Sequence, residues 1–331
     1  MVSKLEDNCQ LPPYVIHQIG DIETLSQVAN WGITDLDIPE VWKKTQGESV
    51  VVAILDSGIP NNDDVNPNIL LDKCRSFIAN EWDDTIGHAT HITGICSSLD
   101  NSLGVVGVAP QSKIVNIKVL SNNGFSTETS ITEGLKYCLG LKPDIINMSL
   151  GGKNPMPEAL EVIKKLDAQG IIMVASAGNN GEKKDKSILY PAVYDQCIAV
   201  GSYSPTTITS KSLFSCIGPE IDLAAPGDQI LSTYLNNQFA VLSGTSMSAG
   251  VVSGVIALYI SYLKKNKIPY TAQSVKDTIL KNCKDVGAEG FDQEFGWGII
   301  SPKKIFQTLQ SVGQPVVVQK TPWWKKLLFW K

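Results

Sequence analysis

The chain has 331 residues, 43% of them hydrophobic and 18% charged, which is enough apolar side chain to bury a sizeable globular core. Its formal net charge of -5 argues against nucleic-acid binding driven by bulk positive charge. The seven cysteines are scattered and lack the spacing of a metal site, which fits free thiols in a reducing compartment. The first residues lack the apolar core of a signal peptide, and no run reaches membrane-spanning length, so we expect a cytoplasmic protein.

The first 30 residues are polar, and Pro12 and Pro13 interrupt any helix there. From Trp31 onwards, short apolar runs alternate with segments that are typical of helices. The runs predict strands at 49–55, 113–120, 144–150, 171–177 and 198–201, and the other segments predict helices at 88–98, 127–141, 157–169 and 251–262. This alternation predicts the α/β class, with a single doubly wound, mostly parallel sheet flanked by helices. Ligands of such sheets bind at the carboxyl ends of the strands.

A candidate nucleophile, Ser246, follows Gly244 and Thr245 and precedes the apolar run 251–262, which predicts a buried helix. A helix N-terminus offers free N–H groups and the positive end of the helix dipole, and both stabilise a developing anion. The nucleophile of an acyl transfer fits this place. Serine is also a common helix cap, and this stretch taken alone favours the cap.

Candidates for an acid, a base and an amide donor occur in other motifs. His88 and His91 are three residues apart, so on a helix they share a face, whereas His17 lies in the irregular first segment. Asp56 ends the first predicted strand, where a carboxylate either orients an imidazole or caps a turn. Asn179 follows another strand and supplies an amide donor, although Asn-Gly turns are also common. Each signal is weak alone, and the combination is much more specific.

These motifs together resemble the subtilisin-like serine proteases. The order Asp, His, Ser along the chain is the order of that family. The resemblance covers about residues 31–309 and is carried by the segments 52–58, 87–91, 147–152, 176–179 and 244–247. It implies the subtilisin-like fold and the activity of a serine endopeptidase that acts on peptide or protein substrates.

By this resemblance, Ser246 is the nucleophile, His88 the base, and Asp56 the group that orients the imidazole. Asn179 donates its side-chain amide to the oxyanion beside the N–H group of Ser246, and His91 is structural. The expected function is intracellular protein degradation or processing. The alternatives are a dedicated protease that removes leader peptides from precursors, and a catalytically dead relative that binds peptides.

The resemblance also places the substrate. The backbone of Ser149, Leu150 and Gly151 would pair with an extended peptide, which adds as an edge strand. Glu128 falls near the fourth substrate pocket, where a carboxylate attracts a basic side chain. Leu189 falls near the floor of the first pocket and would narrow it. Glu128 and Leu189 are also open to interpretation as ordinary surface and packing residues.

Calcium is the cofactor that the resemblance implies. Its ligands would be the oxygens of Leu99, Asn101, Leu103 and Val105, with a carboxylate from Asp64. A shell made only of oxygens suits Ca²⁺. The alternative is a plain Asn-Ser turn.

The two ends of the chain carry further expectations. Residues 1–22 form an inhibitory extension, because 10–14 resembles the extension that blocks the active site of bacterial intracellular subtilisins, which are commonly dimers. Residues 23–312 form the catalytic domain. Residues 313–331 form a tail of lysines and tryptophans, which either contacts a membrane surface or docks on the domain.

Two positions depart from the family pattern. Ala89 stands where the family usually has Gly, and Gly250-Val251 stand where it usually has Pro-His. Neither position is a member of the triad, so we expect activity to survive both changes.

Overall fold

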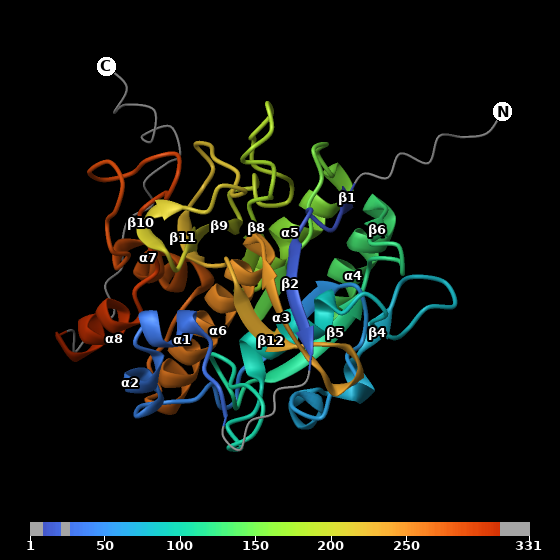
Figure 1. Ribbon diagram of the computed structural model, residues 1–331, viewed down its shortest axis with the longest axis horizontal. Coiled ribbons are helices and arrows are strands. Elements are labelled where there is room, and N and C mark those ends of the chain that lie inside the picture. The colour runs from blue at the N-terminus through green and yellow to red at the C-terminus, as the bar shows by residue number, and fades with distance from the viewer. Residues whose placement is uncertain (1–8, 21–26, 312–331) are drawn as a thin grey trace.

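The computed structural model describes residues 9–20 and 27–311. Its centre is an eight-stranded sheet with the order β10-β9-β8-β7-β3-β5-β4, and β11 pairs with β9 (Figure 1). All of these pairings are parallel except that of β10 with β9. The strands are β3 (Val51–Asp56), β4 (Arg75–Ser76), β5 (Lys113–Lys118), β7 (Ile145–Met148), β8 (Ile172–Ser176), β9 (Cys197–Ser204), β10 (Thr207–Lys211) and β11 (Leu223–Pro226). The predicted mostly parallel sheet is therefore confirmed.

The first long strand, β3, lies at the point where the strand order reverses, with β5 on one side and β7 on the other. Its side chains alternate between two cores: Val52 and Ile54 pack on one face of the sheet, and Ala53 and Leu55 on the other. The crevice of a doubly wound sheet opens at the carboxyl ends of such neighbouring strands. Asp56, the last residue of β3, therefore stands at the natural position of a ligand site.

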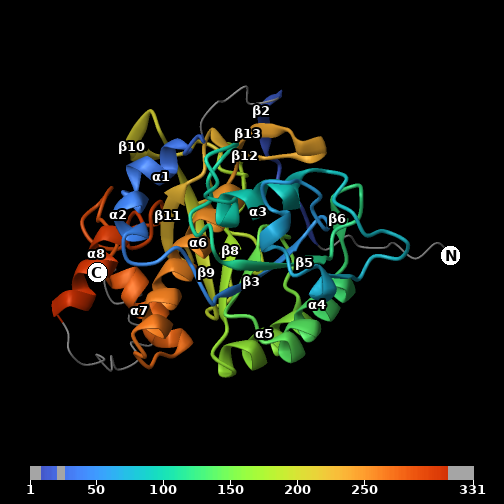
Figure 2. The same cartoon turned by 90° about the horizontal axis from the view of Figure 1, so that it is seen from below.

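Helices cover both faces of the sheet (Figure 2). One core contains apolar side chains of α3 (His88–Ser97) and α6 (Thr245–Lys265), and the other contains those of α4 (Glu128–Leu141) and α5 (Pro157–Ala168). The other helices of the described chain are α1 (Trp31–Asp35), α2 (Ile38–Trp42), α7 (Ala272–Lys281), α8 (Pro302–Ser311) and the 3-10 turns η1 (Asn66–Asn68), η2 (Leu71–Lys73) and η3 (Leu235–Asn237). The helices predicted at 88–98, 127–141 and 157–169 are confirmed within one or two residues.

The helix after the candidate nucleophile is longer than expected, because α6 begins at Thr245 rather than at 251. By length and composition it is the one helix of the described residues that could span a membrane, which corrects the expectation that no run is long enough. However, 94% of its most apolar window is buried inside the domain. A Cβ on Gly250 would lie 3.2 Å from Cγ2 of Ile95, so glycine lets α6 approach α3 closely at one of the departures from the family pattern.

Two small sheets lie outside the central one. Strand β1 (Cys9–Gln10) pairs with β6 (Phe125–Ser126), and β2 (Val15–Gly20) joins the hairpin of β12 (Ile230–Thr233) and β13 (Phe239–Ser243). The sequence indicated an irregular first segment, but the structure shows that this segment contains two strands. Five of the six residues of β2 are exposed, so the strand has no buried face whose alternation a sequence could reveal.

The sequence analysis expected the first residues to block the active site and the last residues to contact a membrane or dock on the domain. The described part of the inhibitory extension is 9–20, and the lysine- and tryptophan-rich tail 313–331 lies outside the described residues. The boundaries at 22 and 312, the homodimer and the membrane contact stay predictions.

Candidate active site

The carboxyl end of β3 meets the first residue of α3. The imidazole Nδ1 of His88 lies 2.8 and 3.0 Å from the two carboxylate oxygens of Asp56, and both side chains are buried. With Nδ1–H donated to the carboxylate, the imidazole presents Nε2 as a proton acceptor. Nε2 is buried and has no hydrogen-bond partner among the described residues. The pair that the sequence analysis proposed as base and orienting acid is therefore assembled, with the basic nitrogen free.

A third carboxylate, Asp84, holds the start of α3 in place, and the sequence analysis missed it. Its two oxygens accept hydrogen bonds from the N–H groups of Ile86, Gly87 and Thr90, and from the hydroxyls of Ser57 and Thr90. The hydroxyl of Ser57, next to Asp56, in turn accepts from the N–H group of Ala89, next to His88. Asp84 and Ser57 thus connect the segment that holds Asp56 to the segment that holds His88. An acid four residues before His88 was the available signal.

The nitrogen of Lys118 is buried close to the same carboxylates. It donates to the carbonyl of Ser57 and, at 3.0 Å, to Oδ1 of Asn122, and it lies 3.7 Å from Glu81. Burial lowers the pKa of Lys118, and the nearby carboxylates, Glu81 first, oppose that shift. A cation at this place favours the charged forms of Asp56 and Asp84, with which Lys118 interacts electrostatically.

Ser246 lies in the first turn of α6, as the sequence analysis expected, but it is not the cap. The N-cap is Gly244, with no side-chain cap bond, so the capping interpretation is wrong. The Oγ of Ser246 donates to the carbonyl of Ser149 at 3.3 Å, and the Oγ of Ser149 donates to the carbonyl of Ser246 at 3.0 Å. In this state the hydroxyl is therefore turned to Ser149 rather than bonded to His88.

Asn179 reaches the same point from the end of β8. Its Oδ1 accepts from the N–H group and the hydroxyl of Thr245, at 2.9 and 2.8 Å, which fixes the orientation of the amide. Its Nδ2 donates to the carbonyl of Pro13 at 2.7 Å. The amide therefore already binds a peptide carbonyl beside Ser246, as an oxyanion donor would.

The carbonyl belongs to the chain's own first segment, which crosses the site. Gln10 exchanges two backbone hydrogen bonds with Gly151, at 3.0 and 2.9 Å, and Leu11 donates to the carbonyl of Gly124 at 3.0 Å. The ring of Tyr14 then lies 5.2 Å from that of His88, centroid to centroid. Gln10 thus makes the strand-like pairing expected of Gly151, and the segment covers His88.

Leu189 lies between the continuations of β7 and β8. A Cβ on Gly151 would lie 2.9 Å from its Cβ, and a Cβ on Gly178 would lie 2.8 Å from its Cγ. Leu189 is 6% exposed. This side chain therefore fills the space between the two backbones, and its role in a first substrate pocket stays a prediction.

Glu128 has a different contact from the one expected. Its Oε1 accepts from the N–H group of Glu158 at 2.8 Å, at the N-terminal turn of α5. A carboxylate is favourable there because the helix dipole is positive at this end. The carboxylate is engaged in the fold, and its role toward substrate stays a prediction.

The loop proposed for calcium brings its oxygens to one point. Nε2 of Gln27 lies 2.5, 3.2 and 3.3 Å from the carbonyl oxygens of Leu99, Leu103 and Val105, and 3.4 Å from Oδ1 of Asn101. An amide nitrogen carries only two protons, so it cannot satisfy four acceptors. A half-turn of the amide would present its oxygen to the same point. The cluster fits a cation, and Gln27 is a ligand candidate that the sequence analysis missed.

The carboxylate of Asp64 adjoins this loop and accepts from the N–H group of Val105 and the amide of Asn101, both at 3.0 Å. No ion pair in the described part of the chain includes it. Burial raises the pKa of Asp64, and the hydrogen bond from Val105 opposes the shift most. A bound cation would favour its charged form.

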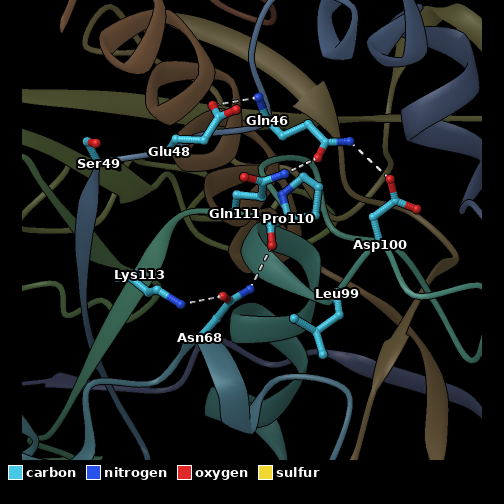
Figure 3. A pocket seen from close by; sticks show the side chains of 9 residues that line it. All are labelled: Gln46, Glu48, Ser49, Asn68, Leu99, Asp100, Pro110, Gln111 and Lys113. Atoms are coloured by element: carbon cyan, nitrogen blue, oxygen red, sulfur yellow. Dashed lines mark hydrogen bonds between the residues drawn. The ribbon is translucent and has the colours of Figure 1, made fainter. Parts of the chain in front are cut away.

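On its other side the loop borders an open polar pocket, which Figure 3 shows. Gln46 bonds Asp100 at 3.0 Å and Gln111 at 2.5 Å, and Lys113 bonds Asn68 at 3.0 Å. These side chains form hydrogen bonds with one another, and the bond from Gln46 connects Asp100 of the loop to the rest of the domain.

The other candidates for chemistry are buried in the fold. The ring of His91 packs behind the β12–β13 hairpin, 3.1 Å from the carbonyl of Ile230 and 3.0 Å from that of Ala240, and burial lowers its pKa to about 3. All seven cysteines are free and buried, in agreement with the expected thiols. His91 is therefore structural, as expected.

A buried Asp–His pair, a serine at a helix N-terminus and a fixed amide donor define a serine hydrolase of the acyl-transfer type. Residues 47–298 match the Subtilase family. The chain is 36% identical to the major intracellular serine protease of Bacillus subtilis, over 85% of this chain and 92% of that protein.

Other relatives support the same family. An intracellular serine protease of Paenibacillus polymyxa is 36% identical over 77% of this chain and 78% of its own length. A thermostable alkaline protease of Halalkalibacterium halodurans is 33% identical, with coverages of 84% and 73%. This chain belongs to the subtilase family. It is a serine endopeptidase, a hydrolase whose substrates are peptides or proteins.

Proposed function

We propose that this chain is an intracellular endopeptidase that acts through Ser246, His88 and Asp56 and is held inactive by its own residues 9–20. The observation that supports inhibition most directly is the bond from Asn179 to the carbonyl of Pro13. That bond uses the donor that a substrate carbonyl would need. The two relatives named as intracellular proteases support the cytoplasm as its place of action.

Catalysis begins when the proton of Ser246 Oγ passes to Nε2 of His88 and Oγ attacks the substrate carbonyl carbon. Asn179 Nδ2 and the N–H group of Ser246 bind the oxygen as it becomes negative. His88 then gives its proton to the leaving amine, and an acyl-enzyme remains on Ser246. Water activated by His88 hydrolyses this ester. Asp56 stabilises the imidazolium at both proton transfers.

The proline pair explains why residues 9–20 would resist their own protease. A substrate paired at Gly151 continues toward Ser246, and one of its backbone N–H groups could donate a hydrogen bond to the carbonyl of Ser149. Pro12 has no N–H group, so the carbonyl of Ser149 is left to accept from Ser246 instead. The nucleophile is thereby held away from His88 while Tyr14 covers the base.

The filled space at Leu189 supports a preference for a small residue, Gly, Ala or Ser, before the cleaved bond. Leu189 packs against both Gly151 and Gly178, and we infer that it takes the space that a large substrate side chain would need. This selectivity favours processing of particular precursors over general degradation. The catalytically dead alternative has no support at the site, since every proposed catalytic side chain is present.

We propose calcium as a structural cofactor, held by the oxygens of Leu99, Asn101, Leu103 and Val105 with Asp64 beside them. The convergence of these oxygens on the amide of Gln27 supports it. A bound ion would fasten the loop and take no part in the reaction.

The test of the nucleophile uses a fluorophosphonate probe, which labels activated serines. Insert a recognition site for a second protease after Gly20, fold and purify the full chain, cut it there, and remove the released segment by gel filtration. The cut chain should be labelled and the Ser246→Ala chain should not. Absence of labelling in the cut chain would refute the catalytic proposal.

The test of inhibition compares the uncut chain with two variants of the same segment. Tyr14→Ala removes the ring that covers His88, and Gln18→Ala changes an exposed side chain of β2. We expect Tyr14→Ala to raise the initial rate of the uncut chain and Gln18→Ala to leave it unchanged. Equal rates for cut, uncut and Tyr14→Ala chains would contradict inhibition by this segment.

A further inference from the structure

Strand β13 pairs with β12 on one edge and with β2 on the other, beside the proposed active site (Figures 1 and 2). The pairing runs from Ser243 opposite Val15 to Phe239 opposite Gly20. Apolar side chains of β2 remain exposed, 50% for Val15 and 45% for Ile19. The strand is therefore held chiefly by its backbone hydrogen bonds, and another extended peptide could take its place.

Residues 9–20 cross the proposed active site in one direction. They pair first with Gly151, then present the carbonyl of Pro13 to Asn179, and then pair with β13. In a substrate bound along the same path, the residues on β13 follow the cleaved bond. The edge of β13 is therefore placed to hold the leaving half of the substrate.

A polar contact breaks the apolar character of this edge. The hydroxyl of Ser243 donates to Oδ1 of Asp228 at 2.6 Å and accepts from the N–H group of Gln229 at 2.7 Å. Nε2 of His17 lies 2.6 Å from the same hydroxyl. Because the hydroxyl proton goes to Asp228, His17 must be a donor here. His17 lies at the register shift between the pairs Leu242–Ile16 and Val241–Gln18, so the bulge aims its ring at the hydroxyl.

We propose that β13 and the Ser243–Asp228 pair form a docking site for the leaving half of the substrate, and that the pair selects a side chain with an N–H donor. The proposal rests on the proteolytic function proposed above. Counted from the carbonyl at Asn179, His17 is the fourth residue beyond the bond. A carboxylate behind the accepting hydroxyl favours a cation, so Lys, Arg or His is preferred there.

The test uses the full chain, cut after Gly20 and freed of its first segment by gel filtration. Its substrates are internally quenched peptides that differ at one position. Each carries either Lys or Leu at the second, third, fourth or fifth residue after the cleaved bond. We expect kcat/KM to be about five- to tenfold higher for Lys than for Leu at the fourth residue, with smaller ratios elsewhere.

Asp228→Asn keeps the shape of the side chain and removes its charge, so the ratio should fall to about one. Asp72→Asn is the matched control, because Asp72 is an exposed carboxylate in the turn η2, outside the path of residues 9–20. That variant should keep the wild-type ratio. Circular dichroism checks the fold, and Ser243→Ala provides a second variant if Asp228→Asn fails to fold.

The outcomes separate this proposal from the one it rests on. Cleavage with equal kcat/KM for Lys and Leu at all positions would overturn the docking proposal and leave the protease intact, as would an unchanged ratio in Asp228→Asn. No cleavage of any peptide by the cut chain would overturn the proposed proteolysis first. In the uncut chain, His17→Leu should raise the initial rate, because the segment loses its hold on Ser243.

Discussion

Replacing Leu189 by alanine should open the space between Gly151 and Gly178 and change the residue that the enzyme accepts before the cleaved bond. The side chain fills the gap so closely that a Cβ on Gly151 would lie 3.0 Å from its Cδ1, and one on Gly178 only 2.9 Å from the same atom. The wild-type enzyme should therefore cleave after Gly, Ala or Ser and discriminate strongly against Leu and Phe.

The magnitude follows from the atoms removed. Leu→Ala deletes three carbons, and a substrate leucine placed in the vacated space would recover about 2–3 kcal/mol of apolar burial. This corresponds to an increase of roughly 30- to 150-fold in kcat/KM for Leu relative to Ala before the cleaved bond. The same deletion leaves a cavity in the substrate-free enzyme and should cost about 2–5 kcal/mol of stability.

The assay measures kcat/KM of the cut chain on four peptides that differ only in Gly, Ala, Leu or Phe before the bond. Ile188→Ala is the matched control, because that neighbour is 5% exposed but contacts the Cβ position of Gly218, away from the pocket. It should lose stability without a change in preference. The reasoning is refuted if the wild-type enzyme already cleaves after Phe as fast as after Ala, or if folded Leu189→Ala keeps the wild-type preference.

Three further predictions concern turnover, pH and calcium. Asn179→Leu should lower kcat by about 10²–10³, the range known for an oxyanion donor of this family, with a smaller change in KM; an unchanged kcat would exclude the donor role. Burial lowers the pKa of His91 from 6.5 to about 3, so between these pH values the unfolded chain binds a proton that the folded chain does not. The contribution of His91 to the free energy of unfolding is therefore fully present above pH 6.5 and decreases as the pH falls. Urea unfolding at pH 7.5 and 5.0 should show a loss of about 2 kcal/mol that His91→Gln lacks, and equal losses in both chains would contradict the assignment. A chelator should lower the melting temperature by about 5–10 °C in the wild-type chain and by much less in Asp64→Asn; no shift in the wild type would refute the calcium site.

The position of the catalytic groups was predictable because each follows a local pattern. Asp56 ends a buried apolar strand, His88 starts a helix, and Ser246 precedes a long, mostly apolar run. Strands of this kind must be covered on both faces, so alternation along the chain requires the parallel sheet and brings the strand ends to one edge. The sequence by itself therefore determined the fold class and the order of the proposed triad.

Other features depend on contacts between segments far apart in the chain. Gln27 reaches the loop at Leu99–Val105 across more than 70 residues, and no local pattern marks it as a ligand candidate. Asp84 acquires its five hydrogen bonds only when α3 folds against β3. Their roles follow from distance in space rather than from spacing in sequence.

The first segment shows most clearly what depends on local sequence and what depends on contacts between distant segments. Its sequence resembles an inhibitory extension, and Pro12-Pro13 marks a break in regular structure, but the segment lacks the alternation of a half-buried strand. Strand β2 exists because the edge of β13 supplies hydrogen-bond partners more than 200 residues away. The sequence by itself determined which residues could react. Only the tertiary structure decided that Pro13, Tyr14 and His17 lie across the proposed active site. The physical reason is that an exposed edge strand forms only through hydrogen bonds with the sheet that it joins.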